Sequence, residues 1–229
     1  MKLPLSDRLL ACATFVPKGS RVADIGCDHG YLGIHLLTSG IATSMIESDI
    51  NEAPLQSALH NAHKYGVADK MTFYLSDGVR NIPRDFDVLV CAGMGADTMM
   101  HILDSAPWLR DSRYRLILQC QSKRPELRKY LYANGFRITR ETLAKDGKFI
   151  YPITEVVYEP AEPLSPAQYH ITPMLLADNS ALLPAFLERV RYGLQVSVDG
   201  LARTGGEKYE EYKAILAELD AIAPKEEQV

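Results

Sequence analysis

The segment ADIGCDHGYL, residues 23–32, joins a short apolar run to an amphipathic one through two glycines. The apolar run at 21–26 is typical of a buried parallel strand, and the residues from 30 to 40 repeat at helical spacing. Gly26 permits a sharp turn, and Gly30 opens the helix with backbone N–H groups that have no partner inside it. A strand, a glycine turn and a helix in this order predict a site for a carboxylate group at the helix start.

The alternation of strands and helices continues along the chain to about residue 160. Further strands are predicted at 41–49, 71–77, 86–93 and 114–120, and further helices at 51–66, 96–106 and 124–135. Two more strands, 136–144 and 148–160, flank the dipeptide Asp146–Gly147, which is typical of a hairpin turn.

Five strand–helix units followed by a hairpin predict an α/β fold with a doubly wound, Rossmann-like sheet and an antiparallel C-terminal hairpin strand. The antiparallel strand favours a class I methyltransferase over a dehydrogenase, whose sheet normally stays parallel throughout. We therefore expect a methyltransferase domain over residues 1–160.

Residues 161–229 differ from this pattern. Four prolines between residues 159 and 173 indicate a linker, and two amphipathic segments follow it at 181–202 and 206–223. Because Gly205 and Gly206 separate the two segments, we expect an antiparallel helical hairpin, that is, a coiled coil, at the C-terminus.

Composition indicates an ordinary globular protein of 229 residues with 47% hydrophobic and 24% charged residues. No run approaches the roughly 18 apolar residues of a membrane span, and the N-terminus does not resemble a signal peptide. The cysteines, Cys12, Cys27, Cys91 and Cys120, have no zinc-ligand spacing. We expect a cytoplasmic protein with free, buried thiols, without a metal or a membrane partner, and a monomer or weak dimer.

The net charge of −4 hides a gradient along the chain. Residues 110–148 hold eleven Lys and Arg against four acidic residues, whereas residues from 160 onward hold six against eleven. A basic segment of this kind fits a phosphate backbone or, equally, a solvated helix face.

Three acidic residues close three successive predicted strands. Asp24 lies two residues before Gly26, where its carboxylate can pair with the ammonium group of a methionine moiety. Asp49 can bond the ribose hydroxyls of a nucleoside, for which Glu47 is a less well placed alternative, and Asp77 can accept from an adenine amino group. Because Asp28 occupies the second glycine position of the dinucleotide fingerprint, S-adenosylmethionine is favoured over NAD.

Several motifs resemble those of one family. ADIGCDHGYL, APLQSA (53–58), SDG (76–78), CAGMG (91–95), ILQ (117–119) and GKFIY (147–151) are similar, in order and spacing, to the bacterial tRNA adenine-22 N1-methyltransferases, the TrmK family. The C-terminal helical hairpin is similar to the coiled coil of that family. The resemblance implies methyl transfer from S-adenosylmethionine to N1 of an adenine in tRNA.

Candidate residues follow from the motifs and the resemblance together. Cofactor contacts are expected at Asp24, Ile25, Gly26, Gly30, Tyr31, Asp49, Ile50, Asp77, Gly78, Ala92, Gly93, Met94 and Gly95. Asp28 and His29 are the candidates for a catalytic role beside the reacting methyl group. RNA contacts are expected at Arg8, Arg110, Arg113, Lys123, Arg124, Arg128 and Lys129.

Two segments depart from the family pattern. Ala96–Asp97 stands where the family usually has a further glycine, and Cys120–Gln121 stands where it typically has Pro–Asn. Two alternatives therefore remain: a methyltransferase acting on another RNA site or a small molecule, and a non-catalytic RNA-binding protein that retains the cofactor fold.

Overall fold

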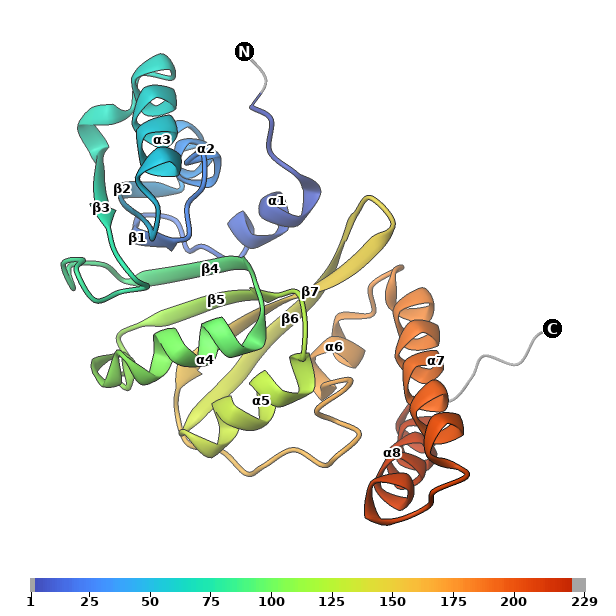
Figure 1. Ribbon diagram of the computed structural model, residues 1–229. Coiled ribbons are helices and arrows are strands. Elements are labelled where there is room, and N and C mark those ends of the chain that lie inside the picture. Colours follow the sequence, from blue (N-terminus) through green and yellow to red (C-terminus); the bar gives the residue numbers. More distant parts are fainter. Residues whose placement is uncertain (1–2, 224–229) are drawn as a thin grey trace.

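The computed structural model describes residues 3–223, which form one seven-stranded sheet in the order β3-β2-β1-β4-β5-β7-β6 (Figure 1). The strands are β1 (Ser20–Ile25), β2 (Ala42–Asp49), β3 (Met71–Leu75), β4 (Val88–Met94), β5 (Arg115–Cys120), β6 (Phe136–Asp146) and β7 (Phe149–Tyr158). Six strands run in the same direction, and only β7 runs opposite to them. The predicted Rossmann-like sheet with an antiparallel hairpin strand is confirmed.

Helices cover both faces of this sheet. They are α1 (Asp7–Ala13), α2 (Tyr31–Thr38), α3 (Glu52–Lys64), α4 (Ala96–Asp104), α5 (Arg124–Ala133), α6 (Pro173–Asp178), α7 (Leu183–Leu201) and α8 (Glu207–Ile222), with short 3-10 turns at Ala68–Lys70 and Pro107–Leu109. The sequence did not predict α1 and α6, because helices of seven and six residues are too short to show a clear period. Ser6 and Thr172 cap them by accepting from the backbone N–H groups of Leu9 and Leu175.

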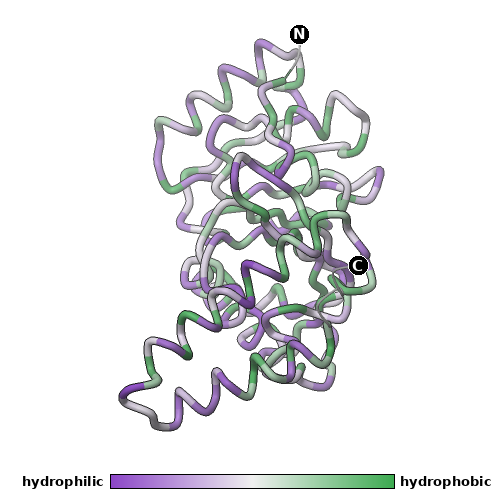
Figure 2. The backbone as a smooth tube through the Cα atoms, turned by 90° about the vertical axis from the view of Figure 1, so that its right-hand side faces the viewer, coloured by the Kyte–Doolittle hydropathy of each residue, from purple (hydrophilic) through white to green (hydrophobic). Residues whose placement is uncertain are grey.

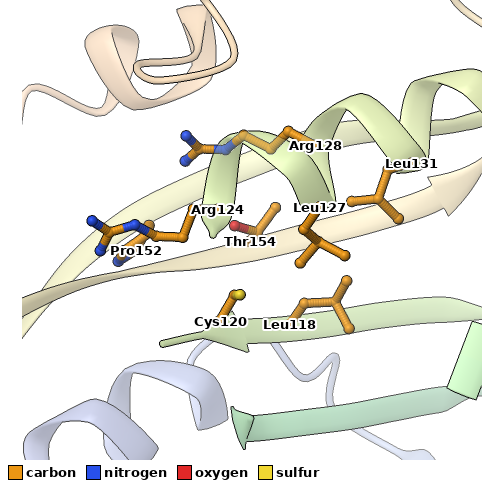
Figure 3. A pocket seen from close by; sticks show the side chains of 8 residues that line it. All are labelled: Leu118, Cys120, Arg124, Leu127, Arg128, Leu131, Pro152 and Thr154. Carbon is orange, nitrogen blue, oxygen red and sulfur yellow. The ribbon is translucent and has the colours of Figure 1, made fainter. Parts of the chain in front are cut away.

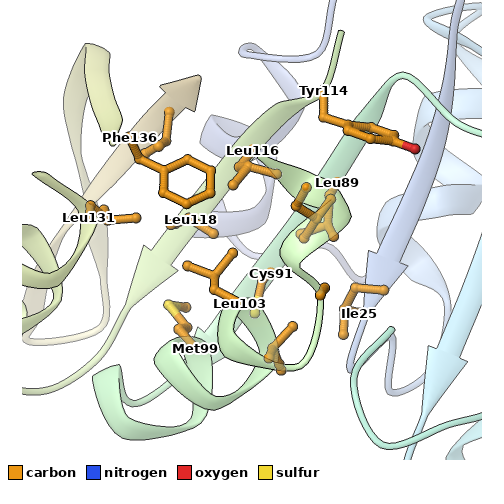
Figure 4. Close-up of a cluster of buried hydrophobic side chains, with 14 of the residues drawn as sticks. Ile25, Leu89, Cys91, Met99, Leu103, Tyr114, Leu116, Leu118, Leu131 and Phe136 are labelled. Carbon is orange, nitrogen blue, oxygen red and sulfur yellow. The ribbon is translucent and has the colours of Figure 1, made fainter. Parts of the chain in front are cut away.

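Two apolar cores lie on opposite faces of the sheet. Helices α4 and α5 close one core, in which Leu89, Leu116 and Leu118 pack against Met99 and Leu131 (Figure 4). Helices α1, α2 and α3 close the other core. The buried sheet between these layers fixes the carboxyl ends of the strands, where the connecting loops are free to build a site.

The β6–β7 hairpin is longer than its neighbour β5 and extends past it. The last pair of residues between β5 and β7 is Leu118 with Thr154, whereas β6 and β7 remain paired as far as Asp146 with Phe149. Five residues of β7 therefore lie beyond the last pair with β5, a length of about 15 Å. Figure 1 shows the tip of this hairpin, in yellow, projecting between α1 and α7.

The C-terminal helices pack on the β6–β7 side of the sheet. Leu143 and Ile150 of the hairpin join Leu175, Phe186 and Ile215 of the C-terminal segment in a third core. Beyond this contact α7 and α8 project from the body of the molecule, and hydrophilic and hydrophobic residues alternate along them (Figure 2). Between residues 3 and 223, no helix is long and apolar enough to cross a membrane.

Candidate functional site

The sheet order brings the three predicted acidic residues to adjacent strand ends. Asp24 lies near the end of β1, Asp49 is the last residue of β2, and Asp77 follows β3 by two residues. Because β3, β2 and β1 are neighbours, these side chains line one stretch of the carboxyl edge. Between β1 and β4 the connections change direction along the sheet, which is where α/β proteins bind ligands.

Asp24 is a buried carboxylate without a hydrogen-bond donor among residues 3–223. Only 4% of its surface is exposed. Burial, followed by the charge of Asp49, raises the pKa of Asp24 to about 7, while Arg8 acts in the opposite direction. A buried acid with a raised pKa and no hydrogen-bond partner among the described residues fits a cationic ligand group.

The glycine turn after β1 is held against two neighbouring strands. Gly26 adopts φ +75°, and its N–H donates to the Ser48 carbonyl at 2.8 Å. A Cβ at Gly26 would lie 2.3 Å from the side-chain methyl of Met94, the last residue of β4, so this side chain packs against the turn. A larger residue at position 26 would have to displace the Met94 side chain and adopt a backbone conformation that favours glycine. The Ile25 side chain instead lies in the core, which leaves only its backbone for a ligand.

Asp28 and His29 lie on the exposed side of the same turn. Asp28 has φ 51°, a left-handed conformation, and its carboxylate lies 3.7 Å from His29 Nε2. Asn61 on α3 donates to the His29 carbonyl at 3.0 Å and so fixes the turn. Sequence reasoning missed Asn61, because nothing in its helix marks it as different from a surface residue. The Tyr31 ring packs beside His29, with centroids 5.9 Å apart.

The ends of β2 and β3 combine acids with exposed apolar side chains. Asp49 accepts from the Asn51 N–H at 2.9 Å, which leaves its other carboxylate oxygen for a ligand. Ile50 is 64% exposed and Leu75 is 55% exposed, although both side chains are apolar. Leu75 pairs with Asp49 across the strands and was not predicted. Exposed apolar groups beside a carboxylate suit a nucleoside, whose flat base can pack on the apolar groups while its ribose hydroxyls donate to the carboxylate.

Asp77 has partners that the sequence did not predict. Its carboxylate forms an ion pair with Arg80 at 2.9 Å and lies 3.8 Å from His101 Nε2. Gly78 follows it with φ +60°, packed against Ile102 of α4. Asp77 therefore closes the β3 end of the site while part of its charge is already neutralised.

The end of β4 carries a bulge that receives an arginine from α1. The pairing between β4 and β5 shifts register between Ala92 and Met94, and the bulged Gly93 has φ +87°. Its N–H donates to Gln119 Oε1 at 3.0 Å, and Arg8 Nη1 donates to the same oxygen. Arg8 Nη1 would lie 3.5 Å from a Cβ at position 93, an ordinary contact, so it is the positive φ of the bulge that favours glycine here.

Gln119 is fully buried, and its amide nitrogen has no acceptor within the part of the chain that the structure describes. Two donors point to Oε1, which fixes the orientation of the amide group and leaves the NH₂ group unpaired. An unpaired buried donor costs about 1–3 kcal/mol. Gln119 thus holds Arg8 and Gly93 in place at a cost to stability, which is typical of a functional site.

Arg128 does not lie where a phosphate could reach it, contrary to the prediction. It is 3% exposed, forms an ion pair with Glu141 at 2.7 Å, and donates to the carbonyls of Tyr169 and His170. Glu141 also accepts from Thr154 and Thr172. Figure 3 shows Arg128 and Arg124 projecting from α5 beside a small cavity lined by Leu118, Cys120 and Thr154 among others. Arg128 therefore joins the C-terminal segment to the sheet.

The other basic residues of α5 lie against the same segment. Arg124 lies over the Phe186 ring at 5.2 Å, and Lys129 lies over the Tyr169 ring at 5.9 Å. Burial lowers the pKa of Arg124, which agrees with its position in this interface. Lys123, just before α5, is exposed and pairs with Asp97 at 2.7 Å. Helix α5 therefore uses its charges mainly to hold the C-terminal segment.

Arg110 and Arg113, two of the predicted RNA contacts, lie away from the acidic residues of the site. Both precede β5, so they lie at the amino end of that strand, opposite the carboxyl edge that carries the acids. Arg110 donates to Asn134, and Arg113 pairs with Asp111 and stacks on Tyr114. Among the predicted RNA contacts, Arg8 is the residue that reaches the site itself.

The remaining predictions concern metals and thiols. Residues 3–223 contain no group of three His, Cys, Asp or Glu side chains placed to hold a metal ion. The four cysteines are free and buried, as expected, and burial raises the pKa of each thiol.

Comparisons with known proteins agree with this geometry. A family model described as a methyltransferase domain matches residues 5–154. The chain is 32% identical to the tRNA (adenine(22)-N(1))-methyltransferase of Bacillus subtilis over 149 residues, which cover 64% of this chain and 63% of that protein. It is 34% identical to a candidate tRNA methyltransferase of Mycoplasma genitalium over 156 residues, covering 67% and 68%. The matched regions thus span about two thirds of these relatives.

A solved structure extends the likeness to the C-terminal helices. It is the candidate tRNA (m1A22) methyltransferase of Streptococcus pneumoniae in complex with S-adenosyl-L-methionine. The two chains are 28% identical with a TM-score of 0.80, and the match covers 93% of this chain and 99% of that one. The similarity therefore includes the segment beyond the methyltransferase domain.

Proposed function

Because the chain belongs to the TrmK family of methyltransferases, we propose that it transfers the methyl group of S-adenosylmethionine to N1 of an adenine in tRNA. The observation that carries this proposal is the partnerless carboxylate of Asp24 beside the Gly26 turn. A cofactor with an ammonium group supplies the missing partner, whereas the pyrophosphate of a dinucleotide would be repelled. This difference favours S-adenosylmethionine over NAD.

The described residues fit each part of this cofactor. Asp24 holds the ammonium group, and the free N–H groups at the start of α2 hold the carboxylate. Asp49 accepts from the ribose hydroxyls, while Ile50 and Leu75 pack against the adenine ring. Asp77 accepts from the adenine amino group with the oxygen that Arg80 leaves free. The rest of the cofactor site is lined by Gly30, Gly78 and the backbone of residues 92–95.

Methyl transfer to N1 of adenine places few chemical demands on the protein. The bound cofactor supplies an electrophilic methyl group, and the N1 lone pair of the substrate is the nucleophile. Holding the two in line supplies most of the acceleration. Because the methylated adenine is cationic, the Asp28 carboxylate at the mouth of the site stabilises the developing charge, and His29 orients Asp28.

The tRNA substrate is supported by the named relatives and by Arg8 at the end of β4. We expect position 22 as the target, with the protein acting as a monomer or weak dimer in the cytoplasm. One observation favours a second candidate, methylation at another RNA position. Asp97, in the first turn of α4, and Lys123, just before α5, form an ion pair beside the two segments that depart from the family pattern. This pair changes the wall that faces the target base.

The test is methyl transfer from labelled S-adenosylmethionine to an unmodified tRNA transcript, with the product nucleoside identified by mass spectrometry. We expect one-methyladenosine at position 22, and no label in a transcript that carries guanine there. Label at another adenine supports the second candidate. A protein that binds S-adenosylhomocysteine but leaves tRNA unlabelled would contradict both RNA assignments. The Asp24→Asn variant controls for contaminating activity.

A further inference from the structure

The β6–β7 hairpin ends in a cluster of exposed cationic and aromatic side chains. Lys145 and Lys148 flank the Asp146–Gly147 turn and are exposed, and Phe149 is 51% exposed. Because β6 is parallel to the strands that carry the site, its end lies at the same edge of the sheet as Asp24. The hairpin also extends beyond that edge, so its tip overhangs the approach to the site.

Two contacts hold this tip in a defined position. On the inner side, Arg8 Nε donates to Asp146 Oδ2 at 3.4 Å. On the outer side, Arg189 of α7 donates to the Lys148 carbonyl at 2.6 Å. The Arg8 contact also neutralises Asp146, the acidic residue at the tip. The tip therefore presents positive charge from a fixed position between α1 and α7 (Figure 1).

Several basic residues of this part of the chain are neutralised by acidic partners. Arg115, Arg128 and Arg137 form ion pairs with acidic side chains. For Lys145 and Lys148 the described residues offer no such ion pair. The Lys148 ammonium instead lies 5.3 Å from the Phe149 ring centroid. These two lysines are thus available to bind an external anion.

Phe149 gives the tip an apolar surface as well. Its ring lies 6.0 Å from that of Tyr151, which is partly exposed, so two aromatic groups adjoin the two lysines. Exposed aromatic rings interleaved with cations suit a strand of unpaired nucleotides, because bases stack on the rings while phosphates meet the charges. A duplex would offer only its phosphates, since its bases are already stacked.

We propose that the tip of the β6–β7 hairpin binds unpaired nucleotides of the RNA substrate beside the target base. Lys145 and Lys148 contact phosphates, and Phe149 stacks on a base. This assignment rests on the proposed function for the identity of the RNA. Both lysines belong to the basic segment at 110–148, and Lys148 and Phe149 also belong to the motif GKFIY, but neither pattern assigned a role to the hairpin tip.

The test is a titration of fluorescently labelled, unmodified tRNA with the full chain at several KCl concentrations. The variant Lys145→Glu/Lys148→Glu is expected to weaken binding at least tenfold. Its slope of log affinity against log salt should be smaller in magnitude by about 1.4–1.8, the value for two lost phosphate contacts. Its affinity for S-adenosylhomocysteine and its Tm should stay unchanged, because the side chains are exposed.

The matched control is Lys18→Glu/Lys70→Glu, which changes the charge equally at the amino ends of β1 and β3. It should keep tRNA affinity within about twofold of the wild type, as expected for weak, screened charges at a distance. Equal losses in both double variants would overturn the proposal, because they would show a general charge effect. Unchanged binding in the Lys145→Glu/Lys148→Glu variant would overturn it directly.

Phe149 is tested separately. We expect Phe149→Ala to weaken tRNA binding about tenfold and Phe149→Trp to retain it, as stacking predicts. Binding of a blunt RNA duplex should not distinguish the two variants, and a loss for the duplex as well would contradict stacking. Because this titration needs no methyl transfer, it also separates the two proposals. A wild type that binds tRNA through the tip without methylating it overturns only the proposed function.

Discussion

Asp24 and Glu47 lie opposite each other in the register of the parallel strands β1 and β2, and both side chains are buried. Glu47 has no exposed surface, and neither carboxylate oxygen has a hydrogen-bond partner among residues 3–223. Its carboxyl occupies the space that a Cβ at Gly33 would need, with Oε1 only 1.9 Å from that position. Two acids thus share one low-dielectric environment beside the Gly26 turn.

Replacing Glu47 by Gln should stabilise the protein increasingly as the pH rises. Burial, followed by the charge of Asp24, raises the pKa of Glu47 well above its ordinary value. An acid with a raised folded pKa keeps its proton in the fold after the unfolded chain has lost it, so the folded state loses stability as pH increases. Gln cannot ionise, and we expect a gain of about 1–3 kcal/mol at pH 8 and little at pH 5.

Urea unfolding at both pH values measures this gain. The control is Glu188→Gln on the exposed face of α7, where no burial acts on the carboxylate. An equal effect of Glu47→Gln at pH 5 and pH 8 would show that Glu47 titrates alike in both states.

Cofactor affinity should depend on pH through Asp24. Since its pKa is raised to about 7, the carboxyl is largely protonated below that pH and cannot pair with an ammonium group. The affinity for S-adenosylhomocysteine should rise up to tenfold per unit from pH 6 to about 7. It should fall again at more alkaline pH, where the α-amino group of the ligand loses its proton.

Calorimetry in two buffers of different ionisation enthalpy should also detect proton release on binding at pH 6.5. The Asp24→Asn variant is expected to bind more weakly and to lose the rise below pH 7, while keeping the fall at alkaline pH. A rise that persists in Asp24→Asn would assign the titration to another group.

Asp28→Asn should lower turnover while preserving the cofactor site. Asn tolerates the left-handed backbone that Asp28 adopts, so the turn remains intact and only the charge is lost. We expect kcat to fall about 10- to 100-fold, with the Kd of S-adenosylhomocysteine within about twofold of the wild type. The matched control is Asp69→Asn, an exposed residue at the far end of β3. Unchanged kcat would remove Asp28 from the mechanism.

Arg128→Met should destabilise the protein by about 3–5 kcal/mol, because it leaves the Glu141 carboxylate buried without its partner. The double variant Arg128→Met/Glu141→Leu should recover much of this loss, since it removes both charges. Chemical denaturation of the four proteins of this cycle gives the coupling energy. Additive losses would show that the pair does not act as a unit.

The local pattern of the sequence was sufficient for most of the fold. Alternation, glycine turns and the Asp146–Gly147 dipeptide predicted all seven strands, because these signals depend on near neighbours. The acids at the strand ends were predictable for the same reason: each lies at a fixed offset from a glycine or a strand end. Helix α1 was missed, although Ser6 is an ordinary helix cap, since seven residues show no period.

Contacts between distant residues could not be predicted from these signals. Arg128 looked like any basic residue of an amphipathic helix, and only the folded chain places Glu141, Tyr169 and His170 around it. In the same way Arg8 and Gln119 are 111 residues apart in the sequence. Whether a cation faces solvent or a buried acid depends on its partner, and a single sequence does not identify that partner.

The third core bears on how this protein can be divided or recombined. Leu143 and Ile150 belong to the sheet, yet they pack with Leu175, Phe186 and Ile215. A cut at residue 160 would expose this apolar surface on one piece and remove its cover from the other. The two C-terminal helices therefore cannot be moved to another protein by themselves. A chimaera with a relative would have to exchange the β6–β7 hairpin together with the helices that pack on it.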